Sequence, residues 1–556
     1  MNKRVAVIGA GLSGLVTVKE LLETGHEPVC YERADGLGGV FRFNENDGVI
    51  WESCRLTSSG YLTAFSDFPV SSTRAEHMHA SEYVHYLKEY CKQYDVLPHI
   101  RFGQGVEAVR RMEDGRWKVT STGNDESMQE EVFDAVAVCS GLHQHPHIPD
   151  IPGLESFQGE AIHAAQYRGV KQVKGKKVLV IGAGESGADI AAEMAKEATE
   201  AVISLRRGVA VVSRMIHGQP RDYLTSRLMN GAAHWVFQTR NPKDNHLRNI
   251  YRILGLPIVV LDKFLDIFLR QAWGTVPILL SGSLSDIKIK LHIRKVTLQL
   301  LAESGGTINE QFGTKDDAFV KALARGKLKR VSGVERIEGQ SVYFADGSTF
   351  EPDLVIFCTG FETRMPFIEE PVAERDRYLN TFDPDLGASI AFIGFVRPSF
   401  GAIPPLAELQ ARWFAKVVSG DGKLPDTGEM HESIECWNRR RQHMFRAKED
   451  RLNHLVDFTE YCDLLAEQVG CKPGKKALAR ESIRFRRRYL SGPFVAAQYR
   501  LTGPGAKPQI AREVIENLPL AHPWPEWVNL HLRWKLCRFL ERVLGPEYAP
   551  KLSNRS

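Results

Sequence analysis

The sequence predicts an α/β fold with two parallel-sheet units, one inserted into the other, a helical insertion and a mainly helical C-terminal tail. Length supports more than one unit, because 556 residues exceed the size of one ordinary domain. Four continuous apolar runs end in glycine turns, as strands buried on both faces of a parallel sheet do. These runs form two pairs of similar sequence, which indicates a duplicated plan.

The first pair of runs reads VAVIGAGLSG from Val5 and VLVIGAGESG from Val178, and the second reads DAVAVCSG from Asp134 and DLVIFCTG from Asp353. We therefore expect strands at residues 4–9, 135–141, 177–182 and 354–360. Their order predicts an interrupted first unit, a second unit within it and a helical region after both. The predicted ranges are 1–169 and 335–420 for the first unit, 170–334 for the second with a helical insertion at about 213–300, and 421–556 for the C-terminal region.

Composition excludes several classes of protein. The 72 basic and 68 acidic residues give a formal net charge of +4, which is too balanced for a nucleic-acid binder with a concentrated basic stripe. The nine cysteines include no CxxC pair, so we expect neither a disulfide framework nor a zinc or other metal site. Scattered cysteines and an N-terminus without the layout of a signal peptide favour a reducing, cytoplasmic location.

Two apolar stretches raise the question of membrane contact. Residues 250–282 are interrupted by charges about every helical turn, which favours amphipathic helices that cover a core over a contact with a membrane surface. Residues 527–544 are apolar and basic at helical spacing. We expect this stretch to dock on the body of the protein. Peripheral contact with lipid stays open as the alternative, and so does a homodimer.

The first glycine motif, Gly9-x-Gly11-x-x-Gly14, follows a predicted strand and opens a predicted helix, Leu12–Glu23. Its glycines permit a tight turn, a close approach of pyrophosphate and close packing of helix on strand, at a helix N-terminus with partial positive charge. The next predicted strand ends in Glu32, eighteen residues after Gly14. A carboxylate there accepts hydrogen bonds from ribose hydroxyls and repels a 2′-phosphate. The first site is therefore predicted to bind FAD or NAD in preference to NADP.

The second glycine motif has the same context and adds a serine hydroxyl for a phosphate oxygen; its residues are Gly182, Gly184, Ser186 and Gly187. The following strand ends in Arg206 and Arg207, where the first unit has its carboxylate. Cations at this place favour the 2′-phosphate of NADPH. The two sites are predicted to hold FAD and NADPH, so that hydride passes from one cofactor to the other.

Another motif lies between the glycine motifs, FQGEAIHAAQY from Phe157 to Tyr167. It resembles the FxGxxxHxxx(Y/F) signature of the flavin-containing monooxygenases, the N- and S-oxygenating branch of the class B flavoprotein monooxygenases. Further stretches resemble the same family in order along nearly the whole chain: YERADGLGGVFRF (31–43), FSDFP (65–69), FIGFVRP (392–398), ELQARW (408–413) and GPFVAAQYRLTGPG (492–505). On this basis the chain is identified as a member of that family.

The resemblance implies an enzyme that uses FAD, NADPH and O2. NADPH would reduce the flavin, which would then form a C4a-hydroperoxide and oxygenate a soft nucleophile, an amine nitrogen or a thioether sulfur. His163 and Tyr167 would order the turn between the two units. The implied FAD contacts are Gly9, Gly11, Ser13, Gly14, Glu32, Gly39, Val40 and Phe41, the implied NADP contacts are Gly182, Gly184, Ser186, Gly187, Arg206 and Arg207, and Gln410 in ELQARW is a further implied cofactor contact.

Two departures from the family pattern concern the flavin site. Val40 and Phe41 stand where members commonly have Leu and Trp. Thr57 stands where the family usually has an asparagine close to the flavin and the nicotinamide. Because a hydroxyl lacks the paired N–H and C=O groups of an amide, stabilisation of the peroxide would be weaker or would rest on Ser58. Thr57 and Ser58 are therefore the candidate catalytic residues.

The substrate stays open at this point. The leading hypothesis is oxygenation of a small amine or thioether, with stepwise N-oxidation of a primary amine or amino acid as one branch. Arg55 could pair with a substrate carboxylate, although a structural role is favoured. The alternatives are an NADPH oxidase or reductase that releases H2O2, a Baeyer–Villiger oxygenase, which Tyr167 opposes, and a non-catalytic membrane-peripheral binding protein. The expected partners are a small nucleophilic substrate and O2, without nucleic acid.

Overall fold

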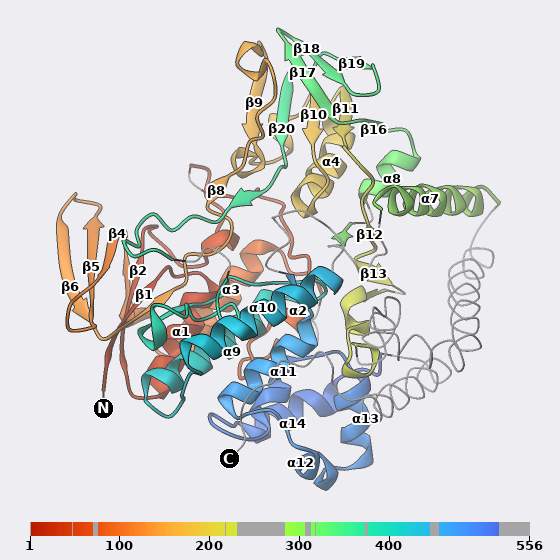
Figure 1. The fold of residues 1–556 in the computed structure, drawn as a ribbon. Helices are drawn as coiled ribbons and strands as arrows, with labels where there is room; N and C mark the ends of the chain where they lie inside the picture. The colour runs from red at the N-terminus through yellow and green to blue at the C-terminus, as the bar shows by residue number, and fades with distance from the viewer. Residues whose placement is uncertain are drawn as a thin grey trace.

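The computed structural model describes residues 2–521 except 47, 71–75, 217, 231–283, 306–312, 317, 373–375 and 445–454. The predicted stretches 250–282 and 527–544 lie outside the described residues. Two sheet-based units stand one above the other in Figure 1, and helices near the C-terminus cover the lower unit. The predicted α/β class with two such units is confirmed. Within the described part of the chain, no helix combines the length and the apolarity needed to cross a membrane.

The first unit is built on a five-stranded parallel sheet. Its central strand is β1 (Arg4–Ile8), which is followed by the predicted helix α1 (Leu12–Glu23). Val5, Ala6 and Val7 are fully buried, because both faces of the sheet are covered. The strand order is β22–β7–β1–β2–β3, with β2 at Glu27–Glu32, β3 at Ile100–Phe102, β7 at Ala135–Val138 and β22 at Ile390–Phe392.

The second unit repeats this plan with a second five-stranded parallel sheet. Its central strand is β10 (Lys177–Ile181), which leads into α4 (Glu185–Glu197). The strand order is β16–β11–β10–β20–β9, with β16 at Lys329–Val331, β11 at Glu200–Ser204, β20 at Leu354–Phe357 and β9 at Glu160–His163.

The duplication extends beyond the glycine turns. Each unit has a three-stranded antiparallel sheet that directly precedes a strand paired with the central one, β7 beside β1 and β20 beside β10. This equivalence explains the similarity of DAVAVCSG and DLVIFCTG. The antiparallel strands are β4 (Gln104–Arg111), β5 (Trp117–Gly123) and β6 (Met128–Phe133) in the first unit, and β17 (Val334–Glu338), β18 (Ser341–Phe344) and β19 (Thr349–Phe350) in the second.

The strand pairing differs from the division expected from the sequence. Strands β9 and β20 pair in the second sheet, although they fall in the ranges 1–169 and 335–420 that the sequence analysis gave to the first unit. The chain crosses between the units at β8 (His145–Pro146) and β21 (Phe361–Glu362), which pair antiparallel. The similarity of each unit to the other reveals the strands, but not the sheet that each strand joins.

The first unit is also covered by helices from distant parts of the chain. Helix α9 (Ile403–Val418) packs along α1, and α11 (Phe458–Val469) packs on α9 (Figure 1). The other α-helices that the structure describes in the first unit and the C-terminal region are α2 (Gly60–Thr63), α3 (Ala80–Gln93), α10 (Thr427–Met444), α12 (Lys475–Arg480), α13 (Ile483–Ser491) and α14 (Pro508–Asn517).

A buried ion network holds these layers together. The Nη2 atom of Arg500 lies 2.5 Å from Glu20 Oε1 in α1, 2.8 Å from Glu408 Oε1 in α9 and 3.3 Å from Asp67 Oδ2. Lys19 Nζ also contacts Asp67 Oδ2 at 2.5 Å and Glu20 Oε1 at 2.9 Å. The side chain of Arg500 is fully buried. Because a buried charge must be paired, these contacts fix α1, α9 and the C-terminal region to one another.

The network also makes the fold sensitive to acid. Burial alone would raise the pKa of Glu20, but Arg500 and Lys19 lower it from 4.5 to about 2. A carboxylate with a depressed pKa in the folded state contributes stability above its unfolded pKa. This contribution is lost as the pH falls from about 4.5 towards 2.

We expect Arg500→Ala to lower the free energy of unfolding by about 3–5 kcal/mol, because three buried carboxylates lose their common partner. The measurement is urea unfolding of the cofactor-loaded protein at neutral pH. Arg512→Ala is the control, since Arg512 pairs with Glu481 near the surface at 3.0 Å and its loss should cost less than about 1 kcal/mol. Equal losses for the two variants would contradict a structural role of the network.

Candidate functional site

The first glycine turn is as tight as a dinucleotide motif requires. A Cβ atom at Gly14 would lie 1.8 Å from the carbonyl oxygen of Gly9, and one at Gly9 would lie 2.9 Å from that of Cys139. Gly9 also has a φ of +101°, which favours glycine. No described side chain caps the N-terminus of α1, where Gly11 is the N-cap. The N–H groups of its first turn therefore stay available for an anion.

Glu32 stands beside this turn, at the carboxyl end of β2. Its Oε2 accepts a hydrogen bond from the N–H of Ala10 at 2.7 Å, and its Oε1 accepts one from the N–H of Ala34 at 2.9 Å. Each oxygen retains a further lone pair. The carboxylate is therefore oriented in advance where the ribose of a dinucleotide on α1 would lie.

Sequence reasoning missed a polar group at the same edge of the sheet. Ser140 follows β7, and its Oγ is buried without a hydrogen-bond partner among the described residues. A Cβ atom at Gly9 would lie 3.4 Å from the Cα of Ser140, so this hydroxyl lies beside the glycine turn. Since an unpaired buried hydroxyl is costly, its position fits a ligand oxygen or N–H group. In the sequence, this serine is visible in DAVAVCSG, but that motif by itself predicts a strand and not a ligand contact.

The residues predicted to flank the flavin form one turn against the glycine motif. A Cβ atom at Gly39, where φ is +53°, would lie 2.9 Å from the Cα of Gly11. Val40 and Phe41 follow in the same short 3-10 turn. The ring of Phe41 meets the ring of Tyr83 edge-on at 4.9 Å. The turn predicted to flank the flavin therefore contacts the glycine motif directly.

Gln410 has a fully buried side chain in α9. Its Oε1 accepts from the N–H of Gly394 at 2.9 Å, and its Nε2 donates to Thr381 Oγ1 and Tyr461 OH, each at 3.0 Å. Gly394 packs closely against α1: a Cβ atom at Gly394 would lie 2.2 Å from Ser13 Oγ. Gln410 thus reaches the first glycine turn through Gly394, and its direct contact with a cofactor stays a prediction.

The second glycine turn repeats the geometry of the first. A Cβ atom at Gly187 would lie 2.1 Å from the carbonyl oxygen of Gly182, and one at Gly182 would lie 2.8 Å from that of Cys358. At Gly184, the N-cap of α4, a Cβ atom would meet nothing within 4 Å. Ser186 lies in the first turn of this helix. The approach to the helix N-terminus is therefore open to a phosphate.

Charges near the second turn suit a phosphorylated ligand. The carboxylate of Glu185, in the first turn of α4, is neutralised by Lys315, whose Nζ lies 3.2 Å from Oε1 and whose N–H donates to Oε2 at 2.9 Å. Arg206 and Arg207 are exposed, two and three residues after the end of β11. The last residue of that strand, Ser204, accepts a hydrogen bond from the N–H of Gly182 at 3.1 Å. The arginines therefore follow a strand end that adjoins the second turn.

The candidate catalytic residues lie in a segment that faces the second unit. Thr57 is half-buried and Ser58 is buried. The N–H of the next residue, Ser59, donates to Asp222 Oδ2 at 2.6 Å. Both Ser59 Oγ and Asp222 Oδ1 are buried without a partner among the described residues. Asp222 was missed by sequence reasoning, and no sequence motif marks it.

A histidine fixes the other side of this segment. His77 Nδ1 lies 3.1 Å from the carbonyl oxygen of Leu56, and its Nε2 lies 3.2 Å from that of Arg214. The Nη2 atom of Arg214 donates to both carboxylate oxygens of Asp189 in α4, at 2.7 and 2.6 Å. Arg55, considered above for a substrate, donates to the carbonyl oxygen of His77 at 3.2 Å. This last bond supports the favoured structural role.

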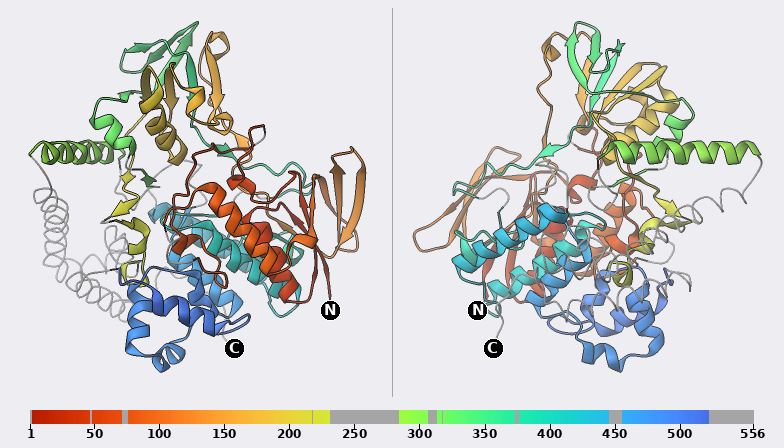
Figure 2. Two further views of the ribbon diagram at one scale, coloured as in Figure 1. Left: turned by 180° about the vertical axis from the view of Figure 1, so that it is seen from behind. Right: turned by 45° about the vertical axis from the view of Figure 1, so that its right-hand side comes forward.

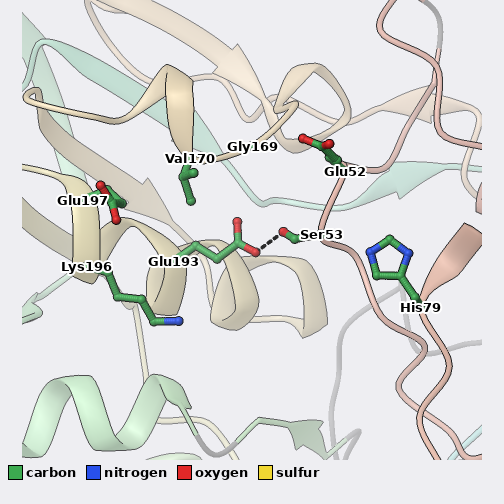
Figure 3. A pocket seen from close by; sticks show the side chains of 8 residues that line it. All are labelled: Glu52, Ser53, His79, Gly169, Val170, Glu193, Lys196 and Glu197. Carbon is green, nitrogen blue, oxygen red and sulfur yellow. Dashed lines mark hydrogen bonds between the residues drawn. The ribbon is translucent and has the colours of Figure 1, made fainter.

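Tyr167 of the family signature takes part in a joint between the units. Glu193 Oε2 accepts a hydrogen bond from Tyr167 OH at 3.1 Å, and its Oε1 accepts from Trp51 Nε1 at 3.2 Å and from Ser53 Oγ. Both Glu193 and Ser53 line a cavity of about 430 Å³. Figure 3 shows the carboxylate of Glu193 directed towards Ser53. This cavity lies at the C-terminal half of α4, away from Gly184, so it belongs to the joint and not to the second glycine turn.

His163 closes the turn that leads to this joint. Its Nδ1 accepts a hydrogen bond from the N–H of Ala165 at 3.1 Å, and its Nε2 donates to the carbonyl oxygen of Gly360 at 2.9 Å. Burial lowers the pKa of His163 and so favours the neutral ring that this pair of bonds requires. The geometry fits the expected ordering role between the two units.

A further set of contacts joins the second unit to the C-terminal helices. Arg227 Nη1 pairs with Asp463 Oδ1 at 2.8 Å. Its guanidinium carbon lies 5.0 to 5.2 Å from the ring centroids of Tyr489, Phe494 and Tyr499. These distances are in the range of cation–π attraction. We call residues 214–230 without 217 the bridging segment, because they contact the first unit at Ser59 and His77 and the C-terminal helices at Arg227.

The sequence predicts no metal site, and one cluster of acidic groups bears on this prediction. Carboxylate oxygens of Glu20, Glu23 and Asp67 lie within 4.8 Å of one another. Lys19 contacts all three carboxylates at 2.5 to 2.9 Å, and Lys507 contacts Glu23 and Asp67 at 2.7 and 2.6 Å. The cluster is therefore part of the buried ion network.

Comparison with known proteins identifies the group to which this geometry belongs. The family model "Flavin-binding monooxygenase-like" matches residues 2–240 and 255–518. A protein from Pseudoalteromonas luteoviolacea (strain 2ta16) named 4-hydroxybenzoate brominase (decarboxylating) is 35% identical over 98% of this chain and 98% of its own length. Human flavin-containing monooxygenase 2 is 34% identical over 91% of this chain and 90% of its own length.

Solved structures share the fold at lower identity. The S-allyl-L-cysteine S-oxygenase from Allium sativum matches with a TM-score of 0.59 and 22% identity, over 86% of this chain and 90% of that one. The NADP+-bound cyclohexanone monooxygenase from Rhodococcus sp. Phi1 matches with a TM-score of 0.55 and 19% identity, over 84% of this chain and 98% of that one. At these identities the likeness concerns the fold alone.

We expect Glu193→Ala to lower the free energy of unfolding by about 2–4 kcal/mol, because the donors on Trp51, Ser53 and Tyr167 lose their acceptor. Tyr167→Phe should cost about 1 kcal/mol, since it removes one of the three bonds. The measurement is urea unfolding followed by circular dichroism. Glu197→Ala is the matched control, because Glu197 is exposed and lines the same cavity from the same helix. A control variant as unstable as Glu193→Ala would contradict the assigned role.

Proposed function

Because this chain belongs to the flavin-binding monooxygenase-like family and is therefore an oxidoreductase that uses FAD and NADPH, we propose that it transfers one oxygen atom of O2 to a small, soft nucleophile. An amine nitrogen or a thioether sulfur is the proposed acceptor. The observation that carries the proposal is the pair of glycine turns with opposite charges at the adjoining strand ends, Glu32 at the first and Arg206 with Arg207 at the second.

The residues around each turn have distinct tasks in this proposal. When bound, FAD supplies the electron-accepting and oxygen-activating chemistry, and NADPH supplies the hydride. The chain's own groups bind and orient the two cofactors. Gly9, Gly11, Ser13, Gly14, Glu32 and Ser140 would hold the pyrophosphate and ribose of FAD, Gly39, Val40 and Phe41 would flank its flavin, and Gly182, Gly184, Ser186, Gly187, Arg206 and Arg207 would hold the phosphates of NADPH.

Thr57 and Ser58 are proposed to donate hydrogen bonds at the reaction centre. Their backbone is held from one side by Asp222 and from the other by His77. A hydroxyl held on a fixed backbone can be aimed at a reacting atom without a large loss of entropy during the reaction. The segment also faces the second unit, which helps to exclude water from the centre.

A halide ion is a second candidate for the nucleophile. The observation that favours it is the 35% identity over 98% of both chains with a protein named as a 4-hydroxybenzoate brominase. Bromide is a soft nucleophile, as a thioether sulfur is, so the same oxygen transfer would produce an oxidised bromine species. An electron-rich phenol would then accept the bromine and release a proton.

The proposal predicts coupled consumption of NADPH and O2 with an acceptor of the right class. The test mixes the FAD-loaded protein with NADPH and air in the presence of an alkylamine, a thioether, or bromide with 4-hydroxybenzoate. Mass spectrometry would identify the product, and a peroxidase assay would measure H2O2. We expect one acceptor class to gain oxygen from isotopically heavy O2, or the phenol to gain bromine, while the yield of H2O2 falls.

The same assay separates monooxygenase from oxidase. Stoichiometric H2O2 with every acceptor would contradict oxygen transfer and support the oxidase alternative. Thr57→Asn restores the residue usual in the family and should lower the share of NADPH that ends as H2O2. Thr57→Ala is the control, because it removes the hydroxyl without adding an amide.

We expect Arg206→Ala together with Arg207→Ala to raise the KM for NADPH about 10- to 100-fold, because the 2′-phosphate loses charge-assisted hydrogen bonds. The KM for NADH should stay within about twofold, because NADH has no 2′-phosphate. Steady-state oxidation of both nucleotides by the wild type and the variant measures the two values. Lys174→Ala removes another exposed cation of the second unit as a control. Equal losses with NADPH and NADH would contradict the assignment.

A further inference from the structure

The C-terminal region carries a concentrated basic surface that the proposed reaction does not use. We define it by five exposed cations of α12 and α13: Lys475, Lys476, Arg480, Arg484 and Arg486. None of the five forms an ion pair with another residue that the structure describes. Five positive charges within twelve residues are a strong local concentration in a chain whose net charge is +4.

Packing of α13 directs its two cations of this surface outward. Phe485 and Tyr489, one helical turn apart, are buried against Ala511 and Ile515 of α14. Arg484 and Arg486, which flank Phe485 in the sequence, are exposed and therefore face away from the body. The acidic residue between the two helices, Glu481, is paired with Arg512 at 3.0 Å and does not neutralise the surface.

An apolar side chain projects from the middle of the basic surface. Ile483, the first residue of α13, is 78% exposed, the largest value among the large apolar residues that the structure describes. It lies in sequence between Arg480 and Arg484, with Ser482 as the N-cap of the helix. Cations around a projecting apolar side chain match the polar headgroups and the acyl boundary of a bilayer.

The location suits contact with a large flat partner. Helices α12 and α13 lie at the end of the molecule opposite the second unit, as Figures 1 and 2 show from three directions. The chain also continues from Ala521, whose N–H donates to the carbonyl oxygen of Ser491 at the end of α13, at 3.0 Å. Residues 527–544, which follow in the sequence, are themselves apolar and basic.

We propose that this basic surface binds the anionic headgroups of a lipid bilayer, with Ile483 inserted at the acyl boundary. Nucleic acid would also be attracted by the cations, but nonspecific nucleic-acid sites commonly add aromatic side chains for base stacking. The aromatic side chains of α13, Phe485 and Tyr489, are buried. The exposed apolar group is aliphatic, which favours lipid.

The experiment is co-sedimentation of the full-length, FAD-loaded protein with phosphatidylcholine vesicles, with and without about one third phosphatidylglycerol. We expect binding to the anionic vesicles alone, and a loss of binding at high salt, where charges are screened within a few Å. The variant R480E/R484E/R486E should weaken binding at least about 100-fold, since each cation near an anionic surface contributes about fivefold. Ile483→Ser should weaken it several-fold without any change in net charge.

The control variant K88E/K92E/K174E makes the same change in net charge at exposed lysines elsewhere. It should keep binding within about threefold, because it leaves the basic surface intact. Equal weakening by both triple variants would overturn the proposal, and so would unchanged vesicle binding by R480E/R484E/R486E, which would assign the contact to another part of the chain. Retention on a DNA duplex without binding to vesicles would also overturn it. Circular dichroism checks that each variant is folded.

Discussion

The desolvated guanidinium of Arg500 is the constraint on which the first unit depends. A fully buried cation must be matched by buried anions, and the chain supplies them from α1, from residues 65–69 and from α9. The helix that begins at the first glycine turn is thereby fixed to α9, and Gln410 of α9 in turn holds Gly394 against Ser13. The geometry of the predicted FAD cradle is thus maintained by a charge network at the C-terminal half of α1.

Helix α4 has the position in the second unit that α1 has in the first. It is held by three carboxylates that lie one helical turn apart. Glu185, Asp189 and Glu193 follow one another at intervals of four residues, which places them on one face of the helix. Each carboxylate binds a different element: Lys315 for the first, Arg214 for the second, and Tyr167, Trp51 and Ser53 for the third. The helix whose N-terminus is predicted to bind a phosphate therefore also holds its unit against the first one, through Glu193.

Sequence reasoning succeeds here where the physical cause is local. The glycine turns, the strands before them and the bounds of α1 follow from short patterns whose steric requirements act within a few residues. The sheet that a strand joins is decided by long-range pairing, so β9 and β20 could not be assigned from their own residues. Asp222 contacts Ser59, Glu193 contacts Trp51 and Ser53, and Arg227 contacts Asp463, each across more than a hundred residues of sequence. No spacing in the sequence indicates these contacts.

The bridging segment changes the mechanics of the molecule. The chain passes between the two units twice, at the paired strands β8 and β21. These two connections alone would form a hinge about which the second unit could rotate. Arg227 adds an attachment away from this axis, clamped by Asp463 and three aromatic rings. A body attached at three points that do not lie on one line cannot rotate unless one attachment gives way. Relative motion of the two units is therefore limited by how far the bridging segment can deform.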